Sequence, residues 1–237
     1  MRVLAIAIAT LAYSSRATAA VCAGGATVQG VDVSSYAGTV DWGAVASSGV
    51  AFAYARVSDG TTVLDPNFDA NYAGIAAAGM VRGAYQFFEP AQDPVAQAKL
   101  VLQKIALPLK PGDLPPALDV EITGGQSAST LAANIASWAS TIRSSIGRPP
   151  VIYANHFFWD TDVQATTFGA LPLWVSQTGV TCPTLPNGWT SWMVWQYSFS
   201  GTVSGIAGAT DLDEFNGSQQ DLEAAAANDF LFVDGFE

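Results

Sequence analysis

Histidine and cysteine, the residues that most often build metal sites and nucleophilic catalysts, are nearly missing from this sequence. Its 237 residues include one histidine, His156, and two cysteines, Cys22 and Cys182. Zinc sites take three or four such ligands, and a catalytic triad needs a histidine beside its nucleophile. The composition therefore predicts no metal and no cofactor, and it leaves most of any chemistry to carboxylates. We interpret His156 as a hydrogen-bonding loop residue rather than a catalyst.

Charge is also scarce, and little of it is positive. Charged residues make up 12% of the chain, with 9 Lys and Arg against 20 Asp and Glu and a formal net charge of −11. That balance argues against nucleic acids and anionic membrane surfaces as partners. No apolar run reaches the roughly 18 residues of a membrane span. We expect a water-soluble monomer with a sizeable apolar core.

The first 19 residues have the pattern of a cleavable secretory signal. Arg2 precedes an apolar stretch of about ten residues, and small residues follow at 17–20. We therefore predict a secreted protein and exclude this segment from the fold. Because export leads to an oxidising compartment, we predict a Cys22–Cys182 disulfide. The alternative, a lipid-modified Cys22, is disfavoured because Val21 is too large for the position before it.

Short apolar runs separated by turn residues predict eight β-strands. Helical segments ending near glycine lie between the early runs, and a further short one follows the last run. This order predicts an α/β fold, a TIM-like barrel of five β/α units followed by three strands without regular helices, in one catalytic domain over 28–227. A doubly wound open sheet is the alternative, and the apolar, acidic tail at 228–237 stays outside the barrel. The predicted strands are 28–33, 50–57, 81–88, 116–121, 150–154, 173–177, 193–197 and 210–215, and the predicted helices are 41–48, 67–78, 93–106, 129–146 and 221–227.

We expect carboxylates at the carboxyl ends of three of the predicted strands, which a barrel brings to one mouth. Asp119 and Glu121 are two residues apart, so in a strand they share a face, with Cα atoms roughly 6.5 to 7 Å apart. Two carboxyl groups this close in a dry cleft cannot both ionise freely, so one pKa rises. A raised acid beside an ionised carboxylate is what glycosidic bond cleavage needs. The other acids in these strands are Asp32, Asp211 and Asp213. For any one of the five acids, the alternative role is a helix cap.

Aromatic residues near strand ends are candidates for a cleft wall against a sugar ring. Most of the seven tryptophans fall in the second half of the chain, where core packing is the default interpretation of a large aromatic. The residues we expect at the cleft wall are Tyr85, Phe88, Tyr153 and Trp195.

An ordered set of motifs resembles the glycoside hydrolase family 25 lysozymes from about residue 28 to 223. Gly30-Val31-Asp32-Val33-Ser34 comes first and Ala117-Leu118-Asp119-Val120-Glu121 lies mid-chain. Val194-Trp195-Gln196-Tyr197 and Asp211-Leu212-Asp213-Glu214-Phe215-Asn216-Gly217 follow near the end. Each motif alone is weak, but their order is specific.

The resemblance implies a muramidase that cleaves the β-1,4 bond between N-acetylmuramic acid and N-acetylglucosamine in peptidoglycan. By position Glu121 matches the family's proton donor, and Asp119 matches the partner acid that assists the substrate's own acetamido group. Asp32 and Asp211 match two outer acids of the family's cleft. Asp213 is a less favoured match for the acid that we assign to Asp211.

Two stretches depart from the family pattern. Gln86 stands where the family usually has histidine, and we place it among the substrate-binding residues. The stretch Ala55–Gly60 replaces a Lys-Ala-Thr-Glu-Gly type sequence. Two other functions remain open: a cell-wall binding protein with weak catalysis on the same barrel, and a hydrolase of another amino-sugar polymer such as chitin.

Overall fold

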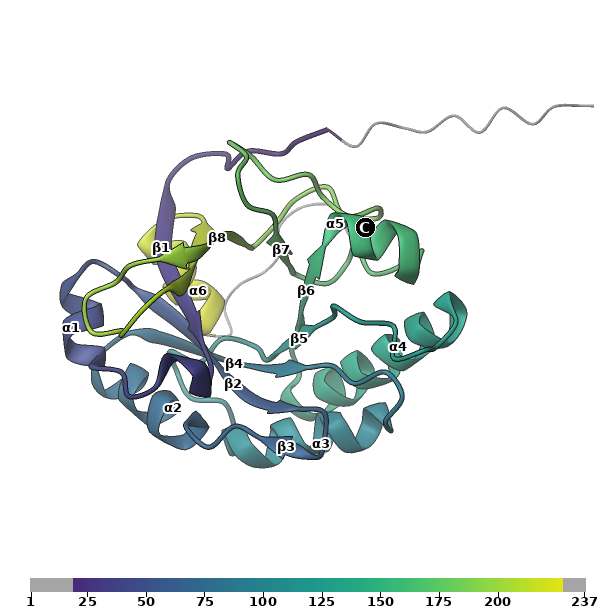
Figure 1. Ribbon diagram of the computed structural model, residues 1–237, viewed down its shortest axis with the longest axis horizontal. Helices are drawn as coiled ribbons and strands as arrows, with labels where there is room; N and C mark the ends of the chain where they lie inside the picture. Colours follow the sequence, from purple (N-terminus) through teal and green to yellow (C-terminus); the bar gives the residue numbers. More distant parts are fainter. Residues whose placement is uncertain (1–18, 228–237) are drawn as a thin grey trace, which may run out of the picture.

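The chain folds as a closed eight-stranded barrel, and one extra short strand pairs with the end of a barrel strand (Figure 1). The computed structural model describes residues 19–227, so the tail and all but the last residue of the predicted signal lie outside it. Pairing between β1 and β2 closes the barrel, which excludes an open sheet. All eight predicted strands are present; only the two-residue β3, paired with the end of β2, was not predicted. The strands are β1 (Thr27–Val33), β2 (Phe52–Asp59), β3 (Val63–Leu64), β4 (Val81–Phe87), β5 (Ala117–Asp119), β6 (Val151–Asn155), β7 (Leu173–Ser176), β8 (Val194–Gly201) and β9 (Thr210–Asn216).

The first four predicted helices follow one another around one side of the barrel, whereas the last predicted helix lies apart from them and contacts β1 and β4 (Figure 1). Side-chain oxygens cap the first turns of four of the five, and Gly147 ends the longest helix in a left-handed conformation. Three short pieces were not predicted, because segments this short carry no periodicity. No helix in the described part of the chain is long and apolar enough to cross a membrane. The predicted helices are α1 (Trp42–Ser47), α2 (Phe68–Ala77), α3 (Pro94–Ile105), α4 (Ala128–Ile146) and α6 (Gln219–Ala226); the others are η1 (Ser35–Ala37), α5 (His156–Phe158) and the π-helical turn η2 (Trp159–Val163).

Strand β9 runs opposite to its neighbours, and this direction decides which of its ends meets the mouth. It pairs antiparallel with both β1 and β8, whereas the pairs from β1 through β2, β4, β5, β6 and β7 to β8 are parallel. Asp211 lies near the start of β9, directly opposite Asp32 near the end of β1. The expectation that every mouth acid sits at the carboxyl end of a strand is therefore wrong for Asp211, since an antiparallel strand brings its amino end to that mouth.

Large aromatic side chains fill the barrel interior, and glycines on neighbouring strands make room for them. The Trp174 ring packs against the Tyr54 and Tyr153 rings at centroid distances of 4.7 and 5.1 Å. A Cβ at Gly30 would lie 2.2 Å from the Phe52 ring, and one at Gly83 would lie 2.1 Å from the Tyr54 ring. The interior is thus a packed core that supports the mouth above it.

We predict that Gly83→Ala destabilises the fold by about 1–3 kcal/mol, because the new methyl group overlaps a fully buried ring. Urea unfolding measures the change. Gly43→Ala in α1 is the matched control: its Cβ would meet only the Asp41 Oδ1 atom, at 3.4 Å, so unfolding should be unchanged or slightly harder. Equal stability of the Gly83→Ala variant and the wild type would contradict the packing described.

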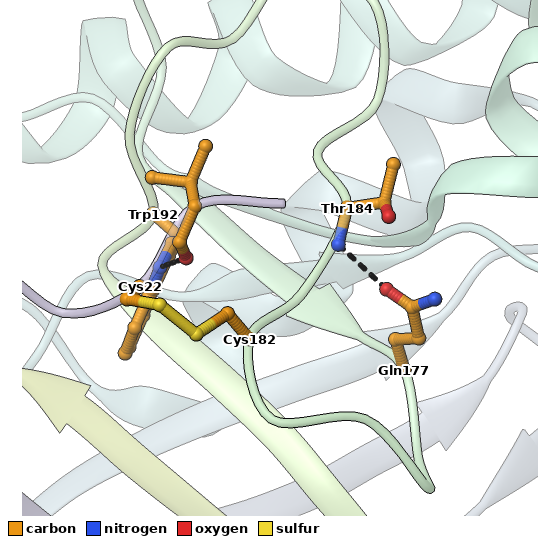
Figure 2. Close-up of a disulfide and its surroundings, with 6 residues drawn as sticks. Cys22, Gln177, Cys182, Thr184 and Trp192 are labelled. Carbon is orange, nitrogen blue, oxygen red and sulfur yellow. Dashed lines mark hydrogen bonds between the residues drawn. A yellow bond between two sulfur atoms is a disulfide. The ribbon is translucent and has the colours of Figure 1, made fainter. Parts of the chain in front are cut away.

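A disulfide joins the start of the described chain to the long loop between β7 and β8, as predicted (Figure 2). Cys22 and Cys182 are 160 residues apart in sequence. Beside the bond, the Val21 backbone N–H donates to the Pro183 carbonyl at 2.8 Å and Trp192 Nε1 donates to the Val21 carbonyl at 2.8 Å. The bond therefore fastens a segment that already has hydrogen bonds to this loop.

Replacing both cysteines by serine should lower the free energy of unfolding by about 2–4 kcal/mol, because the crosslink restricts the unfolded chain over a long loop. Urea unfolding of the variant and of the oxidised wild type measures the difference. Adding a reductant to the wild type should produce the same loss, and the variant should not respond to it. A reductant effect on the variant would contradict this assignment.

Candidate active site

Four carboxyl groups meet at the mouth of the barrel. Asp32 and Asp211 are register partners on β1 and β9, and Asp119 ends β5. Glu121 lies two residues beyond Asp119 and is exposed. The charge of Glu121 acts on the pKa values of all three aspartates, and Asp32 acts on that of Asp119. The four acids predicted from the sequence thus form one cluster.

Asp213 lies beneath this cluster, wholly buried inside the barrel. Its Oδ1 accepts a hydrogen bond from Trp174 Nε1 at 2.8 Å. Burial, and then the charge of Asp32, raises its pKa well above the usual range. A protonated Asp213 can donate through Oδ2 to Asp32, an interaction that lowers the pKa of Asp32 and gives this buried oxygen a partner. Asp213 therefore supports Asp32 from below.

Asp32 holds its proton unusually tightly. Desolvation by burial, followed by the charge of Asp211, raises its pKa to about 8. Burial and Glu121 raise the pKa of the half-buried Asp211 to about 6. The mouth therefore carries fewer negative charges near neutral pH than its four carboxyl groups suggest.

Gln196 on β8 fixes the orientation of Asp32. Its Oε1 accepts hydrogen bonds from the Tyr153 hydroxyl at 2.7 Å and the Ser176 hydroxyl at 3.0 Å. With the amide oxygen occupied, Nε2 faces Asp32 and donates to its Oδ2 at 2.6 Å. Sequence reasoning missed Gln196, although period-two alternation in β8 gives Val194 and Gln196 one face and Trp195 the other.

Asp119 is partly buried and has one oxygen that is buried and unused. Desolvation, then the charges of Glu121 and Asp32, raises its pKa well above the usual range. Its Oδ1 is buried and has no hydrogen-bond partner within residues 19–227. Such an atom is costly in an empty site, so it marks a place where a ligand can donate a hydrogen bond.

Of the five expected substrate-binding residues, only Tyr85 and Tyr153 lie inside the barrel near the acids. Both rings pack against Trp174, and burial raises both tyrosine pKa values well above the usual range, with the mouth aspartates adding to the shift. Tyr85 and Tyr153 can therefore form the apolar floor of the mouth.

Gln86, Phe88 and Trp195 face the layer outside the barrel, which corrects the expectation that they line the cleft. Gln86 Nε2 donates to the Ser58 hydroxyl at 2.9 Å, and its Oε1 accepts from Trp138 Nε1 at 2.8 Å. Phe88 is fully buried in the outer core, and Trp195 Nε1 donates to the Gln177 carbonyl at 2.8 Å. Phe88 and Trp195 were assigned to the cleft because they lie near strand ends, and Gln86 because it stands where the family usually has histidine. Alternation along the strand decides which side each residue faces.

The sequence matches the family model described as Glycosyl hydrolases family 25 over residues 31–206. The chain belongs to this family. It is 36% identical over 211 residues to Lysozyme M1 of Streptomyces globisporus, covering 85% of this chain and 72% of that protein. It is 30% identical to the N,O-diacetylmuramidase of Chalaropsis sp, over 78% of this chain and 96% of that protein. The crystal structure of the bacterial lysozyme from Streptomyces coelicolor superposes with a TM-score of 0.82 at 35% identity, covering 86% of this chain and 98% of that one.

This family 25 chain is a glycoside hydrolase, and its carboxyl groups occupy different environments suited to different tasks. Glu121 meets solvent, Asp119 is largely desolvated, and Asp32 is held by an oriented amide. Within residues 19–227 no group of three or more His, Cys, Asp or Glu side chains could hold a metal ion. The hydrolase thus offers acids in several protonation states at one mouth.

The buried acids predict that stability falls as the pH rises from about 4 to about 8. The unfolded chain releases the Asp32 proton near its ordinary pKa of 3.8, whereas the folded chain keeps it up to about 8. The folded state therefore binds more protons across that range, and raising the pH favours unfolding. Each 1 kcal/mol lost should lower Tm by about 2–4 °C for a domain of this size. Calorimetry across this range measures the slope.

Asp32→Asn should flatten that slope because it removes a buried acid whose pKa is raised to about 8. Asp69→Asn, which alters an exposed carboxyl on α2, is the matched control and should leave the slope unchanged. A Tm that rises from pH 4 to 8 would contradict the assignment.

Proposed function

We propose that this hydrolase is a secreted lysozyme that cleaves the β-1,4 bond between N-acetylmuramic acid and N-acetylglucosamine in bacterial peptidoglycan. The observation that carries the proposal is the pairing of an exposed Glu121 with a partly buried Asp119 whose buried Oδ1 has no partner in the described chain. The related lysozyme and muramidase support the same substrate class.

Glu121 serves as the general acid and base. It donates a proton to the glycosidic oxygen as the bond from that oxygen to the sugar C1 breaks. In the second step it takes a proton from the water that attacks C1, as the bond that the acetamido oxygen formed to C1 in the first step breaks. Its exposed position at the mouth suits both steps, because substrate and water reach it from solvent.

Asp119 is the electrostatic partner in a substrate-assisted mechanism. The acetamido carbonyl oxygen of the muramic acid attaches to C1 as the leaving group departs, and positive charge develops on the acetamido group. Asp119 Oδ1 accepts the N–H of that group, which gives the buried oxygen its missing partner. The developing positive charge also favours the ionised form of this desolvated carboxyl, so the interaction strengthens in the transition state.

Asp32 and Asp211 hold the sugar on the opposite side of the mouth. Gln196 keeps the Asp32 carboxyl in one orientation, and Asp211 is half-buried beside it. Both acids have raised pKa values, so their protonated forms can donate to sugar hydroxyls. Tyr85 and Tyr153 supply the aromatic floor beneath the ring.

Export follows from the N-terminal pattern together with the disulfide. Residues 1–19 match a secretory signal, and the Cys22–Cys182 bond belongs to an oxidising compartment. We propose that the mature chain acts as a monomer outside the cytoplasm.

Glu121→Gln should lower hydrolysis of purified cell walls by about 10²–10⁴-fold, because the amide cannot transfer a proton. Tm should stay close to that of the wild type, since the side chain is exposed. Release of reducing ends measures the rate, and mass spectrometry of the fragments should show muramic acid at the new reducing end. Glu223→Gln on the exposed side of α6 is the matched control and should retain full activity.

Other outcomes would identify a different function. Binding to walls without release of reducing ends by the wild type would indicate a wall-binding protein. Faster release from chitin oligomers than from peptidoglycan would indicate a hydrolase of another amino-sugar polymer. Full activity in Glu121→Gln would refute the assignment of the proton donor.

A further inference from the structure

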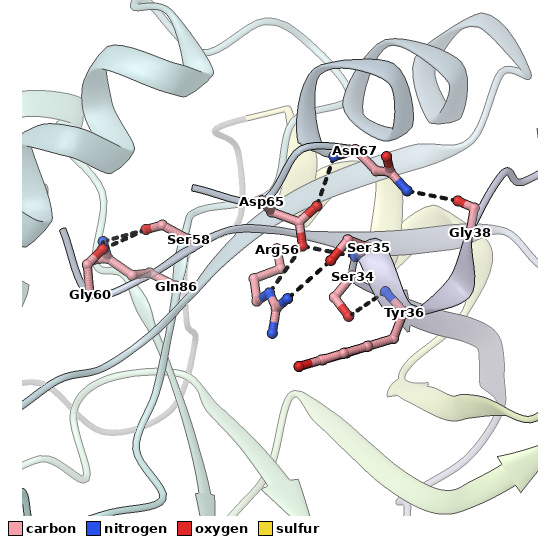
Figure 3. Close-up of polar contacts among 10 residues, drawn as sticks. All are labelled: Ser34, Ser35, Tyr36, Gly38, Arg56, Ser58, Gly60, Asp65, Asn67 and Gln86. Atoms are coloured by element: carbon pink, nitrogen blue, oxygen red, sulfur yellow. Dashed lines mark hydrogen bonds and ion pairs between the residues drawn. The ribbon is translucent and has the colours of Figure 1, made fainter. Parts of the chain in front are cut away.

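Arg56, near the end of β2, is a cation at the mouth with an incompletely used guanidinium (Figure 3). Its Nε donates to Asp65 Oδ2 at 3.1 Å, and Nη2 reaches the Ser35 hydroxyl at a long 3.4 Å. Nη1 makes no hydrogen bond within residues 19–227, and Figure 3 draws it without a dashed line. The Tyr36 ring lies 5.2 Å from the guanidinium carbon and is 90% exposed.

Asp65 holds this cation in place. Its side chain is buried, with Oδ1 accepting the Asn67 backbone N–H at 2.9 Å and Oδ2 accepting the Ser35 backbone N–H at 2.8 Å. A carboxylate fixed by two backbone groups leaves Arg56 little freedom to turn. The Nε side of the guanidinium is therefore anchored, and the Nη1 and Nη2 edge remains available.

The other buried Arg–Asp pair with a tyrosine ring in this chain gives an internal comparison. At the opposite end of the barrel, Arg82 Nε and Nη2 donate to the two oxygens of Asp113 at 2.5 and 3.3 Å. Arg82 Nη1 donates to the Tyr72 carbonyl at 2.9 Å, and the guanidinium carbon lies 3.9 Å from the Tyr72 ring centroid. Every nitrogen of Arg82 thus donates a hydrogen bond, two to Asp113 and one to a backbone carbonyl, whereas Arg56 keeps donors free beside the acids.

The charge of Arg56 reaches the mouth. It lowers the pKa values of Asp119 and Tyr85, against the larger effect of burial on both. The guanidinium edge matches the two oxygens of a carboxylate, and only 16% of its side chain is exposed, so a bound anion would be partly shielded from water.

We propose that Arg56 is a specificity-determining residue that binds a carboxylate of the substrate through its Nη1 and Nη2 edge. The proposal rests on the proposed function, which supplies an acidic glycan. Two sources offer this chemistry: the lactyl group of muramic acid where no peptide is attached, and the carboxyl groups of an attached stem peptide. The exposed Tyr36 ring offers an apolar face beside the same group.

The test is the affinity for a soluble peptide-free glycan in two forms, with its lactyl carboxylates free or converted to methylamides. Titrations in the Glu121→Gln background at about pH 6, where an ordinary carboxyl is ionised, avoid turnover. The free acid should bind about tenfold tighter than the amide. Arg56→Gln should bring the ratio close to one, and Arg56→Lys, which keeps the ion pair with Asp65, should bring it to about threefold.

A second ligand pair, glycan carrying stem peptides with free or amidated carboxyls, separates the two sources. In either pair, tighter binding of the free acid than of the amide supports the site if Arg56→Gln abolishes the difference. The pair that shows this difference identifies the ligand. Arg82→Gln is the control for loss of an ion pair: it should lower Tm without changing either ratio. Equal affinities in both pairs for the parent protein, or ratios preserved in Arg56→Gln and Arg56→Lys, would overturn the proposal.

Wall hydrolysis by the wild type is scored separately from these affinities. A preference without hydrolysis would contradict the proposed reaction and leave the carboxylate site standing. Hydrolysis without a preference for either free acid would support the proposed reaction and contradict the carboxylate site.

Discussion

Closure of the barrel through β1 is the constraint on which the rest of the molecule depends. This strand pairs in parallel with β2 on one side and antiparallel with β9 on the other. The first pairing makes the sheet a closed ring, and the second places Asp32 opposite Asp211. A one-residue slip in either register would turn Asp32 away from the interior, so the geometry of the acid cluster follows from strand pairing.

The same closure sets the chemistry of the acids, because a filled interior removes water from beneath them. Aromatic rings occupy the barrel below the mouth, and desolvation is the largest cause of the raised pKa values of Asp32, Asp119 and Asp213. Hydrogen bonds from Trp174 and Gln196 compensate part of that cost. The network is thus both a structural support and the source of the unusual protonation states.

The sequence was sufficient for the elements and insufficient for the side of the sheet each residue faces. The eight strands, the disulfide and the clustering of four acids could be predicted, because apolar runs and the positions of acids along them are local features. Trp195 and Phe88 were assigned to the cleft because they lie near strand ends, and Gln86 because of its place in the family pattern, yet a shift of one residue along a strand reverses the face. The direction of β9 was also beyond reach, since a single strand carries no mark of whether its partner is parallel.

The scarcity of histidine is not a handicap for a hydrolase of this design. A chain with several residue types can assign acid, base and anchor to side chains with different intrinsic pKa values, whereas this chain separates otherwise similar carboxyl groups by environment. Glu121 meets solvent, Asp119 has one buried oxygen unused, and Asp32 is held by an oriented amide beside an acid whose pKa burial raises. The barrel wall places each carboxyl group at a different depth. It thereby gives these similar groups different roles, which other sites obtain from several residue types.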